Sequence, residues 1–130
     1  MINLRGYVSS RNFMEERVPQ HIQNIVIRDY CNKNNFQYLL SVVEYAMKNS
    51  FMMLNHAIEN HDDEGIVAYS LFQMPYDNKE RINTFNKILD KKKVIHFSVE
   101  SMKITNQKDF EDIENVWLTK KTLKSCLTEF

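Results

Sequence analysis

The residues best suited to chemistry lie in one polar stretch near the amino end, which reads SSRNFMEERVPQH. Ser9 and Ser10 offer hydroxyl donors, and two arginines, Arg11 and Arg17, offer planar donor groups that suit a phosphate or a carboxylate. A helix beginning near Pro19 would add unpaired backbone N–H groups and the positive end of its dipole. This combination predicts an anion-binding site.

The same residues also have a simpler interpretation. Ser9 and Ser10 would only cap and turn the chain, while Arg11 and Arg17 would pair with nearby carboxylates and bind nothing else. Both interpretations stay open at this point.

Three further side chains near this stretch suggest proton-transfer chemistry. His21 falls in the first turn of the expected helix, where the dipole disfavours the imidazolium form and keeps the ring neutral. Glu44 and Tyr45 follow an expected second strand and would approach the same edge of a sheet, so the three could move protons beside a carbonyl or hydroxyl group. Alternatively, His21 is only solvated and Tyr45 only packs. Glu44 would then be the partner of Arg11 or Arg17.

The sequence has no pattern typical of a metal or cofactor site. Cys31 and Cys126 lie far apart and form no CxxC motif, and the histidines and aspartates of residues 56–63 fit a solvated acidic turn better than a metal site. The two glycines, Gly6 and Gly65, cannot form a glycine-rich nucleotide loop. We therefore expect no metal and no cofactor.

The composition indicates one folded domain covering residues 1–130. The chain is 43% hydrophobic and 26% charged, with two Gly and two Pro, which excludes disordered and collagen-like classes. Seventeen basic and seventeen acidic residues balance, so no overall field attracts nucleic acid or an anionic membrane. No stretch approaches the roughly 18 apolar residues of a membrane helix. We expect a reduced, cytoplasmic protein with no nucleic-acid partner and no membrane insertion.

Hydrophobic patterning predicts strands that alternate with helices. The expected strands are Ile2–Val8, Phe36–Ser41, Gly65–Leu71 and Val94–Val99, and the expected helices begin near Pro19, at Phe51, near Asp77 and at Asp109. In the first helix the predicted apolar face consists of Ile22, Ile25, Val26 and Tyr30. Short connections between such elements require right-handed crossovers, hence a three-layer α/β/α domain with a mostly parallel four-stranded sheet. Ligands bind such sheets at the carboxyl ends of the strands.

The order of motifs is similar to that of the serine recombinase catalytic domain, found in resolvases and invertases. The similarity rests on GYVSS, VPQHIQ, EGIVAYSLFQMP and KKKVIHFSVES, and it implies a resolvase-like fold with a long C-terminal helix. In that family the first strand carries an Arg and the nucleophilic Ser, and charged residues follow the third strand. Here Ser9 and Ser10 are out of register, and Phe72, Gln73 and Tyr76 lack the charges. The resemblance therefore implies the fold without recombination chemistry.

A second resemblance covers nearly the whole chain. The strings GYVSSRNFMEERVPQHIQNIVIRDYC, YLLSVVEYAM and GIVAYSLFQMP look like the sporadic carbohydrate cluster proteins, found in bacterial gene clusters for surface polysaccharides such as lipopolysaccharide O-antigen. This resemblance implies a role in making or tailoring a sugar and specifies no reaction. Its distinctive strings contain Ser9, Ser10, Arg11, Arg17, Gln20, His21, Glu44, Tyr45 and Ser70. Gln20 and Ser70 thereby join the expected substrate-binding residues.

Together these observations predict a small cofactor-independent enzyme of polysaccharide biosynthesis. It would catalyse the isomerisation, the epimerisation or an elimination reaction of an anionic sugar, that is, a sugar phosphate, a nucleotide sugar or a carboxylated sugar. The rival hypothesis is a non-catalytic binding or regulatory module that docks on a sugar-modifying enzyme of the same pathway. A third, with Ser9 or Ser10 as a covalent nucleophile, lacks a base positioned by the sequence. The last helix is more apolar than one small sheet can cover, which predicts a homo-oligomer through that helix.

Overall fold

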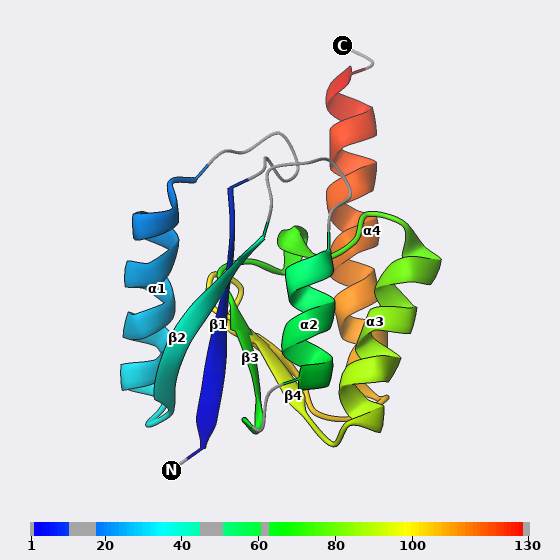
Figure 1. The fold of residues 1–130 in the computed structure, drawn as a ribbon. Coiled ribbons are helices and arrows are strands. Elements are labelled where there is room, and N and C mark those ends of the chain that lie inside the picture. Colours follow the sequence, from blue (N-terminus) through cyan, green and yellow to red (C-terminus); the bar gives the residue numbers. More distant parts are fainter. Residues whose placement is uncertain (1, 11–17, 45–50, 61–62, 129–130) are drawn as a thin grey trace.

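Figure 1 shows the computed structural model, in which helices flank a β-sheet. The structure describes residues 2–10, 18–44, 51–60 and 63–128. In chain order the elements are β1 (Asn3–Ser9), α1 (Gln20–Lys33), β2 (Gln37–Glu44), α2 (Met52–Asn60), β3 (Gly65–Ala68), the 3-10 helix η1 (Leu71–Gln73), α3 (Asn78–Asp90), β4 (Val94–Phe97), β5 (Met102–Ile104) and α4 (Asp109–Thr128). The predicted α/β class is confirmed.

The sheet has five strands in the order β2-β1-β3-β4-β5, one more than predicted. β1 pairs in parallel with β2 and β3, β3 pairs in parallel with β4, and only β5 is antiparallel to its neighbour. β5 was missed because it is only three residues long and buries only Ile104, so its alternation is too short to distinguish a strand from a loop.

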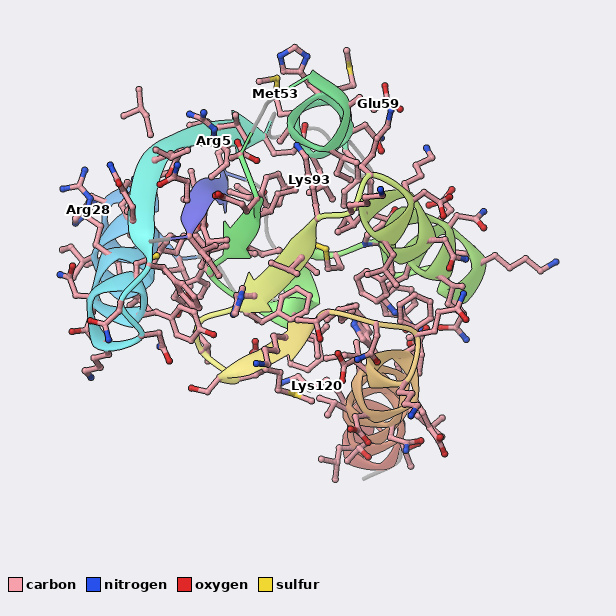
Figure 2. All side chains as sticks on the ribbon, turned by 90° about the horizontal axis from the view of Figure 1, so that it is seen from below. Arg5, Arg28, Met53, Glu59, Lys93 and Lys120 are labelled. Atoms are coloured by element: carbon pink, nitrogen blue, oxygen red, sulfur yellow. The ribbon has the colours of Figure 1, made fainter. Side chains whose placement is uncertain are left out.

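Two helical layers of unequal size cover the sheet. α1 lies alone on one face, and α2, α3 and α4 lie on the other, as both views show (Figures 1 and 2). Each face has its own core. The smaller core, under α1, contains Leu4, Val8, Ile27, Cys31 and Val67. The larger core, opposite, contains among others Tyr7, Leu54, Ile66, Phe85, Ile95, Phe97 and Trp117. β3 is buried along its whole length, as its continuous apolar run predicts.

The buried face of α1 differs from the predicted one. Its fully covered residues are Gln23, Ile27 and Cys31, whereas Ile22 and Ile25 are exposed. The predicted face of Ile22, Ile25, Val26 and Tyr30 follows the apolar residues alone. The buried residues are spaced four apart, and the first of them is Gln23, whose amide forms hydrogen bonds with the end of β1.

β2 contains a bulge and continues three residues beyond its predicted end at Ser41. The pairing with β1 shifts register at Gly6, so β2 contains one additional residue there. Gly6 makes room for the bulge, because a Cβ at that position would overlap the hydroxyl of Ser41 and the ring of Tyr38. The extended strand ends at Glu44, which therefore lies directly beside Ser9.

A network of ion pairs and hydrogen bonds connects α2 with the amino ends of the neighbouring strands β1, β3 and β4. The fully covered carboxylate of Asp63 bridges Arg5 (3.1 Å) and Lys93 (3.4 Å), and Lys93 also donates to the carbonyl of Ala57. Arg5 and Lys93 both lie on the α2 side of the sheet in Figure 2.

Within the described ranges, none of the helices has the length and apolar character needed to cross a membrane.

Candidate functional site

The carboxyl edge of the sheet brings together residues from the ends of β1 and β2. Ser9 and Glu44 are partners in the parallel register. One residue further on, the Ser10 hydroxyl donates to the backbone carbonyl of Glu44 at 3.3 Å. The polar stretch after the first strand and the end of the second strand therefore meet.

The side chain of Gln23 fastens the start of α1 to this edge. Its Nε2 donates to the carbonyls of Ser9 and Val18, each at 2.8 Å. Its Oε1 accepts from the backbone N–H of Ser9 at 3.1 Å and from Nε2 of Gln73 at 2.7 Å. The two donor hydrogens and both lone pairs of the amide are thus engaged, which fixes the side chain in one orientation.

The first turn of α1 begins at this edge, and no side chain of the described residues caps it. Pro19 is the N-cap residue, its carbonyl accepts from the N–H groups of Ile22 and Gln23, and the first turn contains no acidic residue. The N–H groups of Gln20 and His21 belong to the turn that has no intrahelical partner. Gln20 is half-buried and His21 is exposed. Such a helix start favours an anion.

Glu44 is buried at the start of α2, with 1% of its surface exposed. Its Oε2 accepts from the Tyr7 hydroxyl and from the N–H of Leu54, both at 3.1 Å, and its Oε1 accepts from the N–H of Met53 at 3.2 Å. The carboxylate therefore acts as a cap for α2 and joins that helix to β1. These bonds connect Glu44 to α2 and β1 rather than to His21.

Ser70 caps the short helix that follows β3. Its hydroxyl accepts from the N–H of Phe72 and donates to the Glu100 carboxylate at 2.9 Å, and its N–H donates to Oε1 of Gln73. The other oxygen of Glu100 accepts from the N–H of Leu71 at 2.7 Å. Because Gln73 also bonds Gln23, this cap is linked to the end of β1.

Sequence reasoning missed two residues of this network, namely Gln23 and Gln73. Both carry a signal. Ser70 and Gln73 have the S-x-x-Q spacing of a capping box, and Gln23 is the polar member of an otherwise apolar helical stripe. Glu100, at the end of the predicted fourth strand, is a weaker candidate from the sequence, and nothing local indicates its partners, which lie about thirty residues earlier.

Three of the predicted site residues, Arg11, Arg17 and Tyr45, lie outside the described residues. Their roles in anion binding and proton transfer stay predictions. Among the residues that are described, no three His, Cys, Asp or Glu side chains are grouped to hold a metal ion.

The clearest pKa shifts belong to groups under α1, away from this edge. Burial, and to a smaller extent Lys103, lowers the pKa of His96 to about 4. Nδ1 of the neutral ring lies 2.7 Å from the Tyr30 hydroxyl. Burial also raises the pKa of the Cys31 thiol to about 11. Both groups are uncharged at neutral pH and serve the packing of α1 against the sheet.

The arrangement of the sheet and its helices is resolvase-like, as the motif order predicts. The N-terminal catalytic domain of TP901-1 integrase superposes with a TM-score of 0.60 at 11% identity, covering 95% of this chain and 98% of that one. A resolvase family site-specific recombinase from Streptococcus pneumoniae superposes with a TM-score of 0.61 at 9% identity, covering 97% of each chain. At these identities the likeness establishes the fold alone. The sequence matches no family model and no curated protein.

Proposed function

We propose that this chain binds an anionic sugar at the carboxyl edge of its sheet and acts in carbohydrate biosynthesis. One observation carries the proposal: Gln23 holds the first turn of α1, which no described side chain caps, against Ser9, next to Ser10. Backbone N–H groups at a helix start form a binding site for a phosphate or a carboxylate.

The two arginines add to this argument through their place in the chain. Arg11 and Arg17 belong to the segment that joins Ser10 to Val18. Ser9 and Val18 are both hydrogen-bonded to Gln23, so both ends of the segment are fixed at the same edge. A sugar phosphate, a nucleotide sugar or a carboxylated sugar would supply the anion. The resemblance to sporadic carbohydrate cluster proteins supports a sugar, as used in surface polysaccharides of the lipopolysaccharide type.

The proposed chemistry is proton transfer in a cofactor-independent isomerisation, epimerisation or elimination. His21 is exposed in the first turn of α1, where it can reach a ligand held by that turn. Glu44, the last residue of β2, and Tyr45, the next residue in the sequence, would take part in the proton transfer. Gln20 and Ser70 would contact sugar hydroxyls. The reaction would take place in the cytoplasm.

A second candidate, the non-catalytic binding module, is favoured by the placement of Glu44. A carboxylate that already accepts three hydrogen bonds and caps a helix is poorly placed to take a proton from a substrate. The module would bind the same anionic sugar, or a pathway enzyme, without turning the sugar over.

Titration of isotopically labelled protein, followed by NMR, tests the proposal at the level of single amides. The panel consists of glucose 1-phosphate, UDP-glucose, glucuronate and inorganic phosphate, the last as a control for a bare anion. We expect at least one sugar to shift the amide signals of Ser10, Gln20 and His21, while those of Leu118 and Lys121 on α4 stay in place. Absence of shifts with every sugar, or equal shifts with inorganic phosphate, would contradict a sugar site.

The spectrum of the sugar itself separates the two candidates. A new isomer or an eliminated product supports the enzyme. A sugar that binds at Ser10 and His21 but returns unchanged supports the module.

A further inference from the structure

The turn between β4 and β5 places one further carboxylate, that of Glu100, at the carboxyl edge of the sheet. Backbone hydrogen bonds fasten this turn to the end of β3. The N–H of Ser98 donates to the Ala68 carbonyl at 3.0 Å, and the N–H of Val99 donates to the Tyr69 carbonyl at 2.9 Å. Because the parallel strands end at one edge, Glu100 lies at the same edge as the end of β1 and the start of α1.

Two glutamine side chains connect Glu100 and its partner with the proposed anion site. The Ser70 hydroxyl donates to Glu100 at 2.9 Å, and the Ser70 N–H donates to Oε1 of Gln73 at 3.2 Å. Nε2 of Gln73 donates to Gln23 at 2.7 Å, and Gln23 is bonded in turn to Ser9. Glu100 and the start of α1 are therefore the two ends of one hydrogen-bonded row along the edge.

The carboxylate of Glu100 can accept more hydrogen bonds than it receives from the described residues. Oε2 accepts from the Ser70 hydroxyl, and Oε1 accepts from the N–H of Leu71 at 2.7 Å. An ionised carboxylate has about four acceptor positions, so each oxygen keeps one open. Glu100 is half-buried, whereas Ser70 is 4% exposed and Glu44, which accepts three hydrogen bonds, is 1% exposed. Of these three side chains, Glu100 is the one most open to a ligand.

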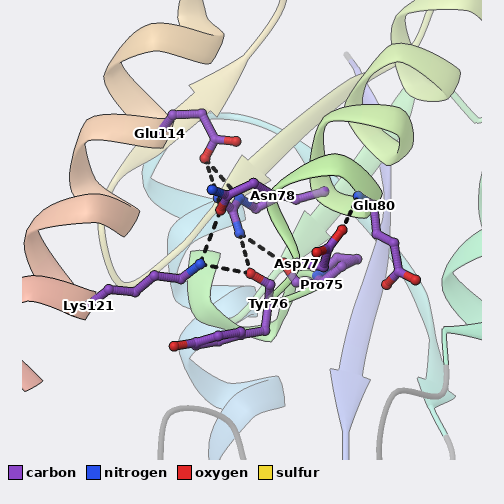
Figure 3. A network of polar contacts seen from close by, with 8 residues as sticks. Pro75, Tyr76, Asp77, Asn78, Glu80, Glu114 and Lys121 are labelled. Atoms are coloured by element: carbon purple, nitrogen blue, oxygen red, sulfur yellow. Dashed lines mark hydrogen bonds and ion pairs between the residues drawn. The ribbon is translucent and has the colours of Figure 1, made fainter. Parts of the chain in front are cut away.

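The negative charge of Glu100 also has no cationic partner within the described ranges, where none of the ion pairs includes it. Glu114, another half-buried carboxylate, accepts instead from Nε (2.9 Å) and Nη2 (2.5 Å) of Arg81, in the network of Figure 3. That guanidinium is 1% exposed and lies 4.2 Å from the ring centre of Trp117. A partly covered carboxylate without a cation favours a ligand that donates hydrogen bonds to it.

We propose that Glu100 binds the hydroxyl end of the sugar whose anionic group lies at the start of α1. This inference rests on the proposed sugar site and adds its specificity. Sugar hydroxyls donate charge-assisted hydrogen bonds to the open acceptor positions of Glu100. A second anionic group at that end of the sugar would lie beside the charge of Glu100 and be repelled. The site therefore takes sugars that are anionic at one end and carry free hydroxyl groups at the other, and it rejects sugars that are charged at both ends.

Calorimetry with two sugars and one substitution tests the proposal. Glucose 1-phosphate is charged at one end, and glucuronate 1-phosphate also carries a carboxylate at the opposite end. The wild type should bind glucose 1-phosphate about tenfold more tightly than glucuronate 1-phosphate. Glu100→Gln keeps the size of the side chain and removes its charge, so it should weaken the binding of glucose 1-phosphate about tenfold and strengthen that of glucuronate 1-phosphate. A merely structural role would weaken both alike.

Two further measurements complete the design. Glu111→Gln makes the same change at an exposed position on α4 and should leave both affinities as in the wild type. In NMR spectra of the wild type, glucose 1-phosphate should shift the amide signal of Leu71, which donates to Glu100, whereas inorganic phosphate should leave it in place.

The results separate this inference from the proposed function. If no sugar of the panel shifts the amides of Ser10, Gln20 and His21, the proposed sugar site is wrong, and this inference is wrong with it. If a sugar does shift them, three results overturn the role of Glu100 alone. These are a Leu71 amide that glucose 1-phosphate leaves in place, a wild type that binds both sugars equally, and a Glu100→Gln variant whose two affinities stay unchanged or fall together.

Discussion

Replacing Gln23 with leucine tests the clamp that holds the candidate site together. The substitution keeps the size of the side chain but removes an amide that makes four hydrogen bonds, to Ser9 (two), Val18 and Gln73. Each buried bond contributes about 1 kcal/mol net. The sum, about 4 kcal/mol, is a large part of the stability of a domain of this size, which is about 5–15 kcal/mol.

Urea denaturation measures the effect directly. We expect Gln23→Leu to lower the free energy of unfolding by about 3–5 kcal/mol with an unchanged slope on urea. Gln37→Leu, the same change at an exposed position at the start of β2, should cost less than about 0.5 kcal/mol. In a double-mutant cycle, Gln23→Leu and Gln73→Leu should couple by about 1 kcal/mol, because the two amides bond each other. A loss below about 1 kcal/mol for Gln23→Leu, or strict additivity in the cycle, would refute the reasoning.

Three further predictions concern stability. Folding lowers the pKa of His96 from 6.5 to about 4, so the unfolded chain binds the His96 proton more tightly than the folded chain does. The free energy of unfolding should therefore fall by about 3 kcal/mol as the pH drops from 6.5 to 4. Urea titrations across this range should lose that slope in His96→Asn and keep it in His21→Asn, and equal slopes in both variants would contradict the assignment. Arg81→Lys should lower the free energy of unfolding by about 3–5 kcal/mol, because lysine cannot make the forked bond to Glu114 or stack on the Trp117 ring. Thermal unfolding, followed by the fluorescence of the single tryptophan, measures this loss. An unchanged midpoint would be inconsistent with the network. In chemical denaturation, Glu44→Ala should lower the free energy of unfolding by about 2–4 kcal/mol, whereas Glu59→Ala, at an exposed position, should change it very little. Equal losses in the two variants would contradict the cap of α2 by Glu44.

The sequence predicts those parts of the fold that depend on local pattern. The continuous apolar run of β3 indicates a strand buried on both faces, and Asp77 is the N-cap of α3, as its position before an apolar helical face suggests. β5 escapes prediction because three residues cannot establish an alternation. Arg81 resembles an ordinary helix-surface charge, since the partner that buries it, Glu114, lies 33 residues further along the chain.

The candidate site divides in the same way. That Ser10 and Glu44 meet follows from the rule that parallel strands end at one edge. The partners of Glu44 in α2 and those of Gln23 at the ends of β1 and η1 do not follow, because these partners lie between 9 and 50 residues away in the chain, beyond the reach of a local spacing rule.

Isothermal calorimetry of an Arg17→Ala variant tests most directly the claim that this edge binds an anionic sugar. The titrant is the sugar that shifts Ser10 and His21 in the NMR panel, and Arg28→Ala is the matched control, an exposed arginine on α1 that lies over the Tyr38 ring. The account predicts that Arg17→Ala abolishes binding while Arg28→Ala retains the affinity of the wild type. Unchanged affinity in Arg17→Ala would contradict it.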